Sequence, residues 1–151
     1  MSIEATLTEL GLSLPPAPKP AGAYIPTRRS GNLVFVAGQI PMAAGQMIAT
    51  GSVPGAVSME VAQRCAVQCV LNGLAAIKAE LGSLEAVKQF VRLGVFVCSE
   101  AGFTEQPKVA NAASELLVKL FGEKGKHARA AVGSVALPLG APVEIEFVVE
   151  A

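Results

Sequence analysis

The chain has 151 residues, of which 52% are hydrophobic and 16% charged, and its twelve basic and twelve acidic side chains cancel. This length suits one domain, and the apolar excess predicts a second buried surface beyond the core, most simply an interface between subunits. Because no basic cluster is longer than the pair Arg28 and Arg29, the charge argues against a groove for nucleic acid.

The N-terminus and the cysteines predict a cytoplasmic protein. The first residues lack the basic start and apolar core of a signal peptide, and the uncharged segment 30–59 is broken too often by Gly, Pro and Gln to span a membrane. Cys65, Cys69 and Cys98 have no metal-ligand spacing, so we interpret them as reduced thiols in the core. The lone histidine, His127, is expected in an exposed loop.

Residues 1–20 are expected to form an arm, and residues 21–151 a single domain. Ser2 is a suitable cap for a short helix over residues 2–10, after which "LPPAPKPAG" predicts an extended, proline-stiffened segment. Strands are expected at residues 24–28 and 33–37, joined into a hairpin by the turn "SGN". The glycine- and proline-rich segment that follows predicts a loop with at most one short strand, near Met47.

The remaining elements alternate between helix and strand. Ser58 is expected to cap a helix that Gly82 ends, because apolar residues recur between them at steps of three and four. Residues 88–98 predict a strand that is buried on both faces. A second helix is expected from Thr104, as its cap, to Leu120 or Phe121, followed by strands at residues 129–137 and 143–150.

This order of elements predicts an α+β domain in which two helices pack on one face of a mixed sheet. Two helices cannot cover both faces of the sheet. The strands at Leu33 and Phe90 nevertheless carry apolar side chains on both sides. We therefore expect further copies of the chain to close the other face, giving a small cyclic oligomer.

Arg129 is the polar residue that most needs an explanation, because no charged residue follows it until Glu144. A guanidinium next to so much apolar chain is satisfied by a carboxylate of the same fold, by solvent or by an anionic ligand. Residue type alone leaves an ion pair with Glu144 or Glu146 as good an interpretation as a ligand site.

The segments "GNLVFVAGQIP", "HARAAV" and "LPLGAPVEIE", in this order and spacing, resemble the RidA/YjgF family, formerly called endoribonuclease L-PSP. The similarity covers residues 20–151, and the arm looks like an extension found in one branch of the family. The resemblance implies a chorismate-mutase-like fold and a homotrimer whose sheets face inward, with clefts between the subunits. It implies neither a metal nor an organic cofactor.

Active members of the family hydrolyse reactive enamines and imines, such as 2-aminoacrylate, to 2-oxo acids and ammonia. The resemblance implies that Arg129 grips the substrate carboxylate, that Glu144 handles the attacking water, and that Tyr24, Gly38 and Asn111 help to bind the substrate. Water attacks an iminium carbon without a covalent nucleophile, which suits a sequence that lacks a Ser/His/Asp or Cys/His set. The expected ligand is a small imine or 2-oxo acid.

Each of these residues also has a purely structural interpretation. Glu144 lies on an alternating strand whose glutamates ordinarily face water, and Tyr24 is a lone aromatic residue that suits a packing anchor. Gly38 is equally compatible with a turn, and Asn111 with a solvated helix surface.

Two other functions are compatible with the sequence. A noncatalytic binder of small carboxylates would keep the arginine but lose turnover, since alanines replace two serines and a cysteine of the family motifs, at Ala37, Ala130 and Ala131. Ribonuclease activity is disfavoured by the neutral net charge and by the lack of a basic, aromatic face.

Overall fold

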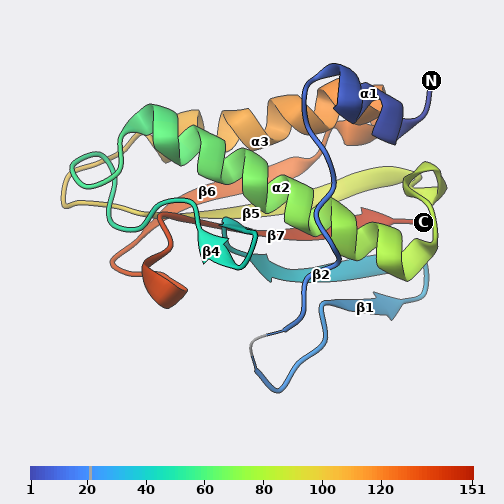
Figure 1. Cartoon of the computed structure of the whole chain (residues 1–151), viewed down its shortest axis with the longest axis horizontal. Coiled ribbons are helices and arrows are strands. Elements are labelled where there is room, and N and C mark those ends of the chain that lie inside the picture. Colours follow the sequence, from blue (N-terminus) through green and yellow to red (C-terminus); the bar gives the residue numbers. More distant parts are fainter. Residues whose placement is uncertain (21) are drawn as a thin grey trace.

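A computed structural model describes residues 1–20 and 22–151, and it has two layers, which Figure 1 shows. One layer is a five-stranded sheet, and the long helices α2 and α3 lie side by side on one of its faces, as predicted. Along the chain the elements are α1 (Ile3–Glu9), β1 (Thr27–Ser30), β2 (Leu33–Gln39), β3 (Met42–Ala43), β4 (Gln46–Met47), α2 (Met59–Leu81), η1 (Leu84–Ala86), β5 (Gln89–Cys98), α3 (Gln106–Phe121), η2 (Gly122–Gly125), β6 (Ala128–Ser134), η3 (Pro138–Gly140) and β7 (Val143–Glu150).

The sheet has the strand order β1-β2-β7-β5-β6 and is mixed, as predicted: β5 and β6 are parallel, and the other neighbours are antiparallel. In β7, buried apolar residues alternate with half-buried residues that include Glu144 and Glu146. Phe147 packs against α2 at Gly73, where an added Cβ would come within 2.5 Å of the ring. Because side chains alternate along a strand, the two glutamates face away from the helices.

The capping of α2 was predicted correctly, and that of α3 was not. The Ser58 hydroxyl accepts a hydrogen bond from the backbone of Val61, and Gly82 ends α2 in the left-handed conformation. The third helix begins at Gln106, so Thr104 is not its cap. Pro107 occupies the first turn and has no N–H to donate, which reduces the need for a side-chain cap.

The first strand begins three residues later than predicted, at Thr27. Tyr24 and Ile25 lie outside the sheet, and their side chains are 52% and 55% exposed. Pro26 marks the boundary: its carbonyl accepts a hydrogen bond from the backbone of Ala37, but its ring nitrogen cannot donate one. Pro26 therefore sets the point at which β1 begins to pair with β2, although the residues before it, Tyr24 and Ile25, are apolar enough for a strand.

Two further segments differ from the prediction. The expected loop contains a small hairpin, β3–β4, whose turn residues Ala44 and Gly45 both have positive φ angles. The strand expected at residues 129–137 ends at Ser134, before the short 3-10 turn of η3. Neither change alters the order of the sheet.

The face of the sheet away from the helices is partly open in the single chain. Phe35 of β2 and Val132 of β6 are each 46% exposed, and Val91 of β5 is 37% exposed. The prediction that the Leu33 and Phe90 strands are covered on both faces is therefore not met within one chain. The oligomer expected to cover this face stays a prediction.

The N-terminal arm is fixed to the helical layer. Leu7 of α1 is buried, the backbone N–H of Ile3 donates to Glu85 at 2.8 Å, and Glu4 pairs with Lys78 at 2.7 Å. From there the arm crosses α2 towards β2 (Figure 1). The predicted boundary between arm and domain, residue 21, lies outside the described residues.

In residues 1–20 and 22–151, no helix combines the length and the hydropathy needed to cross a membrane.

Candidate functional site

The Arg129 side chain lies on edge strand β6 and points towards α3. One guanidinium nitrogen, Nη1, donates to Asn111 Oδ1 at 2.9 Å and to Ser114 Oγ at 3.1 Å. Both acceptors are neutral, and among the described residues no carboxylate lies within ion-pair distance of Arg129. Glu146 instead pairs with Arg92 at 3.1 Å. The arrangement holds the guanidinium in place without neutralising its charge.

Ser114, which the sequence analysis did not single out, connects Arg129 to His127. His127 Nδ1 lies 2.7 Å from the carbonyl oxygen of Gly125, which can only accept, so the network places the proton on Nδ1. His127 Nε2 then accepts from the Ser114 hydroxyl at 2.8 Å, and the same hydroxyl accepts from Arg129. His127 is therefore not the exposed loop residue that was expected.

Burial lowers the pKa of His127 below its ordinary value of 6.5. The Gly125 carbonyl acts in the opposite direction, and the positive charge of Arg129 lowers the pKa further. A neutral imidazole is the form that accepts the serine proton. The structure thus favours the protonation state that keeps the chain of hydrogen bonds to Arg129 complete.

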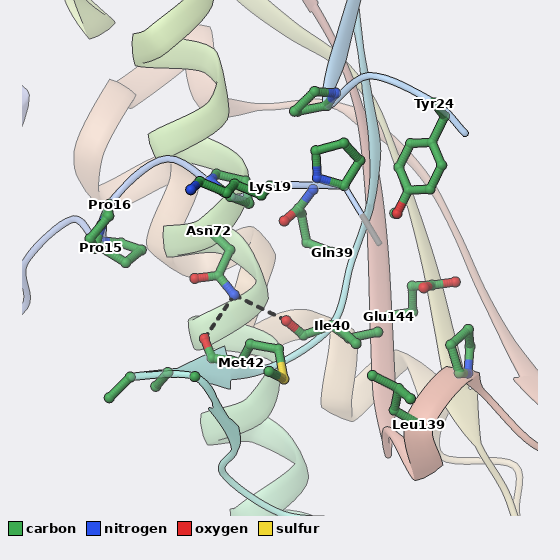
Figure 2. A pocket seen from close by; sticks show the side chains of 18 residues that line it. Pro15, Pro16, Lys19, Tyr24, Gln39, Ile40, Met42, Asn72, Leu139 and Glu144 are labelled. Carbon is green, nitrogen blue, oxygen red and sulfur yellow. Dashed lines mark hydrogen bonds between the residues drawn. The ribbon is translucent and has the colours of Figure 1, made fainter. Parts of the chain in front are cut away.

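A second polar group lies in a cavity of about 620 Å³ beside the end of β2, shown in Figure 2. Three residues singled out from the sequence line it: Tyr24, Gly38 and Glu144. The rest of the lining comes from the arm, the end of β2 and the residues that follow it, the β3–β4 hairpin, α2 and η3, and includes Pro15, Pro16, Pro18, Lys19, Ile40, Met42, Asn72 and Leu139. Arg129 and Asn111 do not line this cavity.

Glu144 approaches the backbone of Gly38 closely. A Cβ added at Gly38 would lie 3.0 Å from Glu144 Cδ and 3.2 Å from its Oε2. The register between β2 and β7 also shifts between Val36 and Gln39, which bends the backbone at this point. Gly38 is therefore needed because of a close approach, rather than to form a turn.

The carboxyl group of Glu144 is harder to ionise than that of an exposed glutamate. Burial raises its pKa above the ordinary value of 4.5, and the negative charge of Glu146 raises it further. In Figure 2 the Tyr24 hydroxyl is directed towards the Glu144 side of the cavity. A carboxyl with a raised pKa beside a cavity is suited to proton transfer.

Residues 4–150 match the family described as "YjgF/chorismate_mutase-like, putative endoribonuclease". The chain belongs to the YjgF family. This confirms the resemblance inferred from the sequence motifs, and the mixed sheet with its helices matches the chorismate-mutase-like fold of the family.

Individual known proteins also align with nearly the whole chain. Protein TCP17 of Trypanosoma cruzi is 42% identical over 149 residues, which cover 98% of this chain and 93% of TCP17. The crystal structure of Atu1372 from Agrobacterium tumefaciens, described as having unknown function, is 46% identical with a TM-score of 0.93, covering 98% of this chain and 91% of that chain. A "putative endoribonuclease" from Shewanella oneidensis is 27% identical with a TM-score of 0.96, covering 100% of both chains.

Asn72 is a further polar residue of the cavity that the sequence analysis missed. Its side chain is 6% exposed, and its amide donates to the carbonyl oxygens of Ile40 and Met42, both at 3.0 Å (Figure 2). Gln68 donates to its oxygen at 3.0 Å. Asn72 thereby fixes the chain after β2 against α2. Its signal in the sequence is an asparagine on an otherwise apolar face of a long helix.

Within one chain of this YjgF protein, Arg129 and Glu144 do not meet. In the register of the sheet, Arg129 pairs with Leu93, and Leu93 pairs with Phe147. Because paired residues share a face, Arg129 lies on the face that the helices cover, whereas Glu144 lies on the opposite face. Strand β5 lies between β6 and β7, so the two backbones are roughly 10 Å apart across the sheet alone. The structure therefore brings Tyr24, Gly38 and Glu144 together, brings Arg129 and Asn111 together, and keeps the two groups apart.

In the described part of the chain, no three His, Cys, Asp or Glu side chains are grouped to hold a metal ion.

Proposed function

We propose that the protein hydrolyses reactive enamines and imines of the 2-aminoacrylate type to 2-oxo acids and ammonia. The observation that carries this proposal is the Arg129 guanidinium, which neutral oxygens of Asn111 and Ser114 hold while no carboxylate of the described chain pairs with it. Its remaining N–H groups form a planar fork that fits a substrate carboxylate. A charge-assisted hydrogen bond of this kind contributes about 1.5 to 3 kcal/mol.

The proposed active site lies between two copies of the chain. The opposite orientations of Arg129 and Glu144 support this, because one small acid cannot contact both side chains of one chain. The open apolar face with Phe35 and Val132 supports a cyclic assembly, since exposed apolar patches of this kind mark interfaces. In the homotrimer that we propose, Arg129 and Asn111 of one copy face the Glu144 cavity of the next.

The chemistry requires only water and proton transfers. An enamine first takes up a proton on carbon to become the imine, and water then adds to the carbon of the C=N bond. The water oxygen loses two protons in turn and the imine nitrogen gains two, the C–N bond breaks, and ammonia leaves a 2-oxo acid. Glu144, with its raised pKa, would take the proton from water and return it to nitrogen. Tyr24 would orient the intermediate from the cavity wall.

The decisive experiment removes the guanidinium. Arg129→Ala should lower kcat/KM about ten- to hundredfold or more, which corresponds to one or two lost charge-assisted hydrogen bonds. The assay follows 2-oxo acid formation from an imine generated in place by an amino-acid oxidase, after subtraction of spontaneous hydrolysis. Arg64→Ala, which removes an exposed arginine from α2, is the matched control and should retain full activity. Equal rates in wild type and Arg129→Ala would overturn the assignment.

A noncatalytic carboxylate binder is the second candidate. Ala37, Ala130 and Ala131 favour it, because they supply no hydroxyl or thiol where the family motifs place serines and a cysteine. Calorimetry would then detect 2-oxo acid binding that Arg129→Ala abolishes, while the wild type adds nothing to spontaneous imine hydrolysis.

Ribonuclease activity, which appears in the description of the family, is the third. The net charge of zero weighs against it. Cleavage of RNA by the purified wild type but not by Arg129→Ala would favour it over the deaminase.

A further inference from the structure

The cavity beside Glu144 is larger than a three-carbon imine requires. Its volume is about 620 Å³, whereas cavities of about 300 to 1,000 Å³ ordinarily hold ligands of drug size. The carboxylate of the substrate is assigned to Arg129, which does not line the cavity. The volume beyond Glu144 is therefore available to the side chain of the substrate rather than to its acid group.

The lining of the cavity favours an apolar occupant. Gln39 and Asn72 are buried there, but their amides already donate to backbone carbonyls, Gln39 to Ala37 at 2.9 Å and Asn72 to Ile40 and Met42. Asn72, whose oxygen also accepts from Gln68, therefore offers little hydrogen bonding to a ligand, and Gln39 offers mainly its amide oxygen. Away from Glu144, Tyr24 and Lys19, the surface that remains is mostly aliphatic, with Ile40, Met42 and Leu139 (Figure 2).

The N-terminal arm forms one wall of the cavity with its prolines, Pro15, Pro16, Pro18 and Pro20. Proline has no N–H and a fixed φ angle, so this wall is stiff and mainly apolar, although Lys19 also lines it. Upstream, Leu12 and Leu14 pack against the core, and α1 is held by buried Leu7. The wall is thus in place before a ligand arrives, which reduces the entropic cost of binding.

We propose that the arm makes this site selective for 2-imino acids with large apolar side chains, aliphatic or aromatic. The inference rests on the proposed function and names its substrate class. With the carboxylate on Arg129 of a neighbouring copy and the imine carbon beside Glu144, the side chain lies between the proline wall and the β3–β4 hairpin. A methyl side chain would leave most of this apolar surface uncovered.

The test compares imines that an amino-acid oxidase generates from alanine, leucine and phenylalanine. The wild type should hydrolyse the leucine- and phenylalanine-derived imines with a kcat/KM at least about tenfold higher than the alanine-derived imine. Each buried methylene raises kcat/KM by a factor of about four. The leucine-derived side chain has three more carbons than the alanine-derived one, so the ratio of the two kcat/KM values should exceed about tenfold even when burial is incomplete. The corresponding 2-oxo acids, measured by calorimetry, should bind in the same order.

Two substitutions in the arm make the test specific. Pro18→Asp places a charge on the cavity wall and should lower kcat/KM for the leucine-derived imine about tenfold, while the alanine-derived imine changes less than twofold. Ala17→Asp is the matched control, because Ala17 is exposed, adjacent and not part of the lining. It should change neither rate.

The outcomes separate this inference from the proposed function. If the wild type prefers the alanine-derived imine, or if Pro18→Asp slows both imines equally, the role of the arm is wrong and the hydrolase remains. If no imine is hydrolysed but 4-methyl-2-oxopentanoate binds more tightly than pyruvate in a Pro18-dependent manner, the selectivity stands and the hydrolase is wrong. If nothing is hydrolysed or bound, both are wrong.

Discussion

The Arg129 end and the Glu144 end of the molecule are built by different means. Directed hydrogen bonds place Arg129: Asn111 and Ser114 accept from it, and His127 accepts from Ser114 in turn. Glu144 is placed by close packing, because Gly38 lets the carboxyl approach the backbone and no ion pair with Glu144 is formed among the described residues. The first end is arranged to hold a fixed positive charge, and the second to carry a proton.

The largest effect is expected from Glu144→Gln. The amide keeps the shape of the side chain but cannot exchange a proton, so kcat should fall about 100-fold or more. Binding of a 2-oxo acid should change less than about threefold, because Arg129 supplies the carboxylate contact. Steady-state rates and calorimetry measure the two quantities. A variant that loses binding and turnover equally would show that Glu144 serves the structure of the cavity rather than proton transfer.

Co-assembly of Glu144→Gln with Arg129→Ala tests whether the two ends meet across a subunit boundary. Each variant alone is expected to be nearly inactive. If every site takes Arg129 from one copy and Glu144 from the next, random mixing of equal amounts restores about a quarter of the sites. Refolding the mixed variants, with each variant refolded alone as the control, measures this recovery. Activity that stays at the level of the separate variants contradicts a shared site.

The sequence predicted the helices and strands better than it predicted which side chains from different elements contact one another. Periodicity and caps are local, so Ser58 and Gly82 located α2 correctly. The sequence also pointed to Arg129 and Glu144, through the family motifs. It did not show that they face opposite sides of the sheet, because this depends on the parallel register of β5 with β6. Ser114 and Asn72 were missed for the same reason: their roles arise from partners that lie far away in the chain.

Gly38→Ala should have a smaller effect than the loss of Glu144. The added methyl group would sit 3.0 Å from Glu144 Cδ, so the carboxyl must shift by a few tenths of an ångström. Because proton transfer depends on such positions, we expect kcat to fall about tenfold with little change in binding. The thermal midpoint should fall by less than about 4 °C, which checks that the effect is local. An unchanged kcat would show that the approach of Glu144 to Gly38 is not needed.

The smallest effects are opposite responses of folding stability to pH at the two ends. The pKa of Glu144 is raised in the folded state, so its contribution to stability is present below pH 4.5 and is lost as the pH rises through the folded pKa. The pKa of His127 is lowered, so its contribution is present above pH 6.5 and is lost as the pH falls through the folded pKa.

Two variants, each of which lacks one of these titrating side chains, separate the two pH responses of folding stability. Relative to wild type, Glu144→Gln should gain stability between pH 4 and pH 7. His127→Gln, whose amide can still donate to Gly125 and accept from Ser114, should gain relative stability as the pH falls from 7 to 5. Differences in thermal midpoint on the order of 1 to 3 °C are expected, measured by calorimetry at each pH. If the two differences in thermal midpoint changed with pH in the same direction, burial would not be the common cause of the two pKa shifts, and the contrast between the two ends would fail.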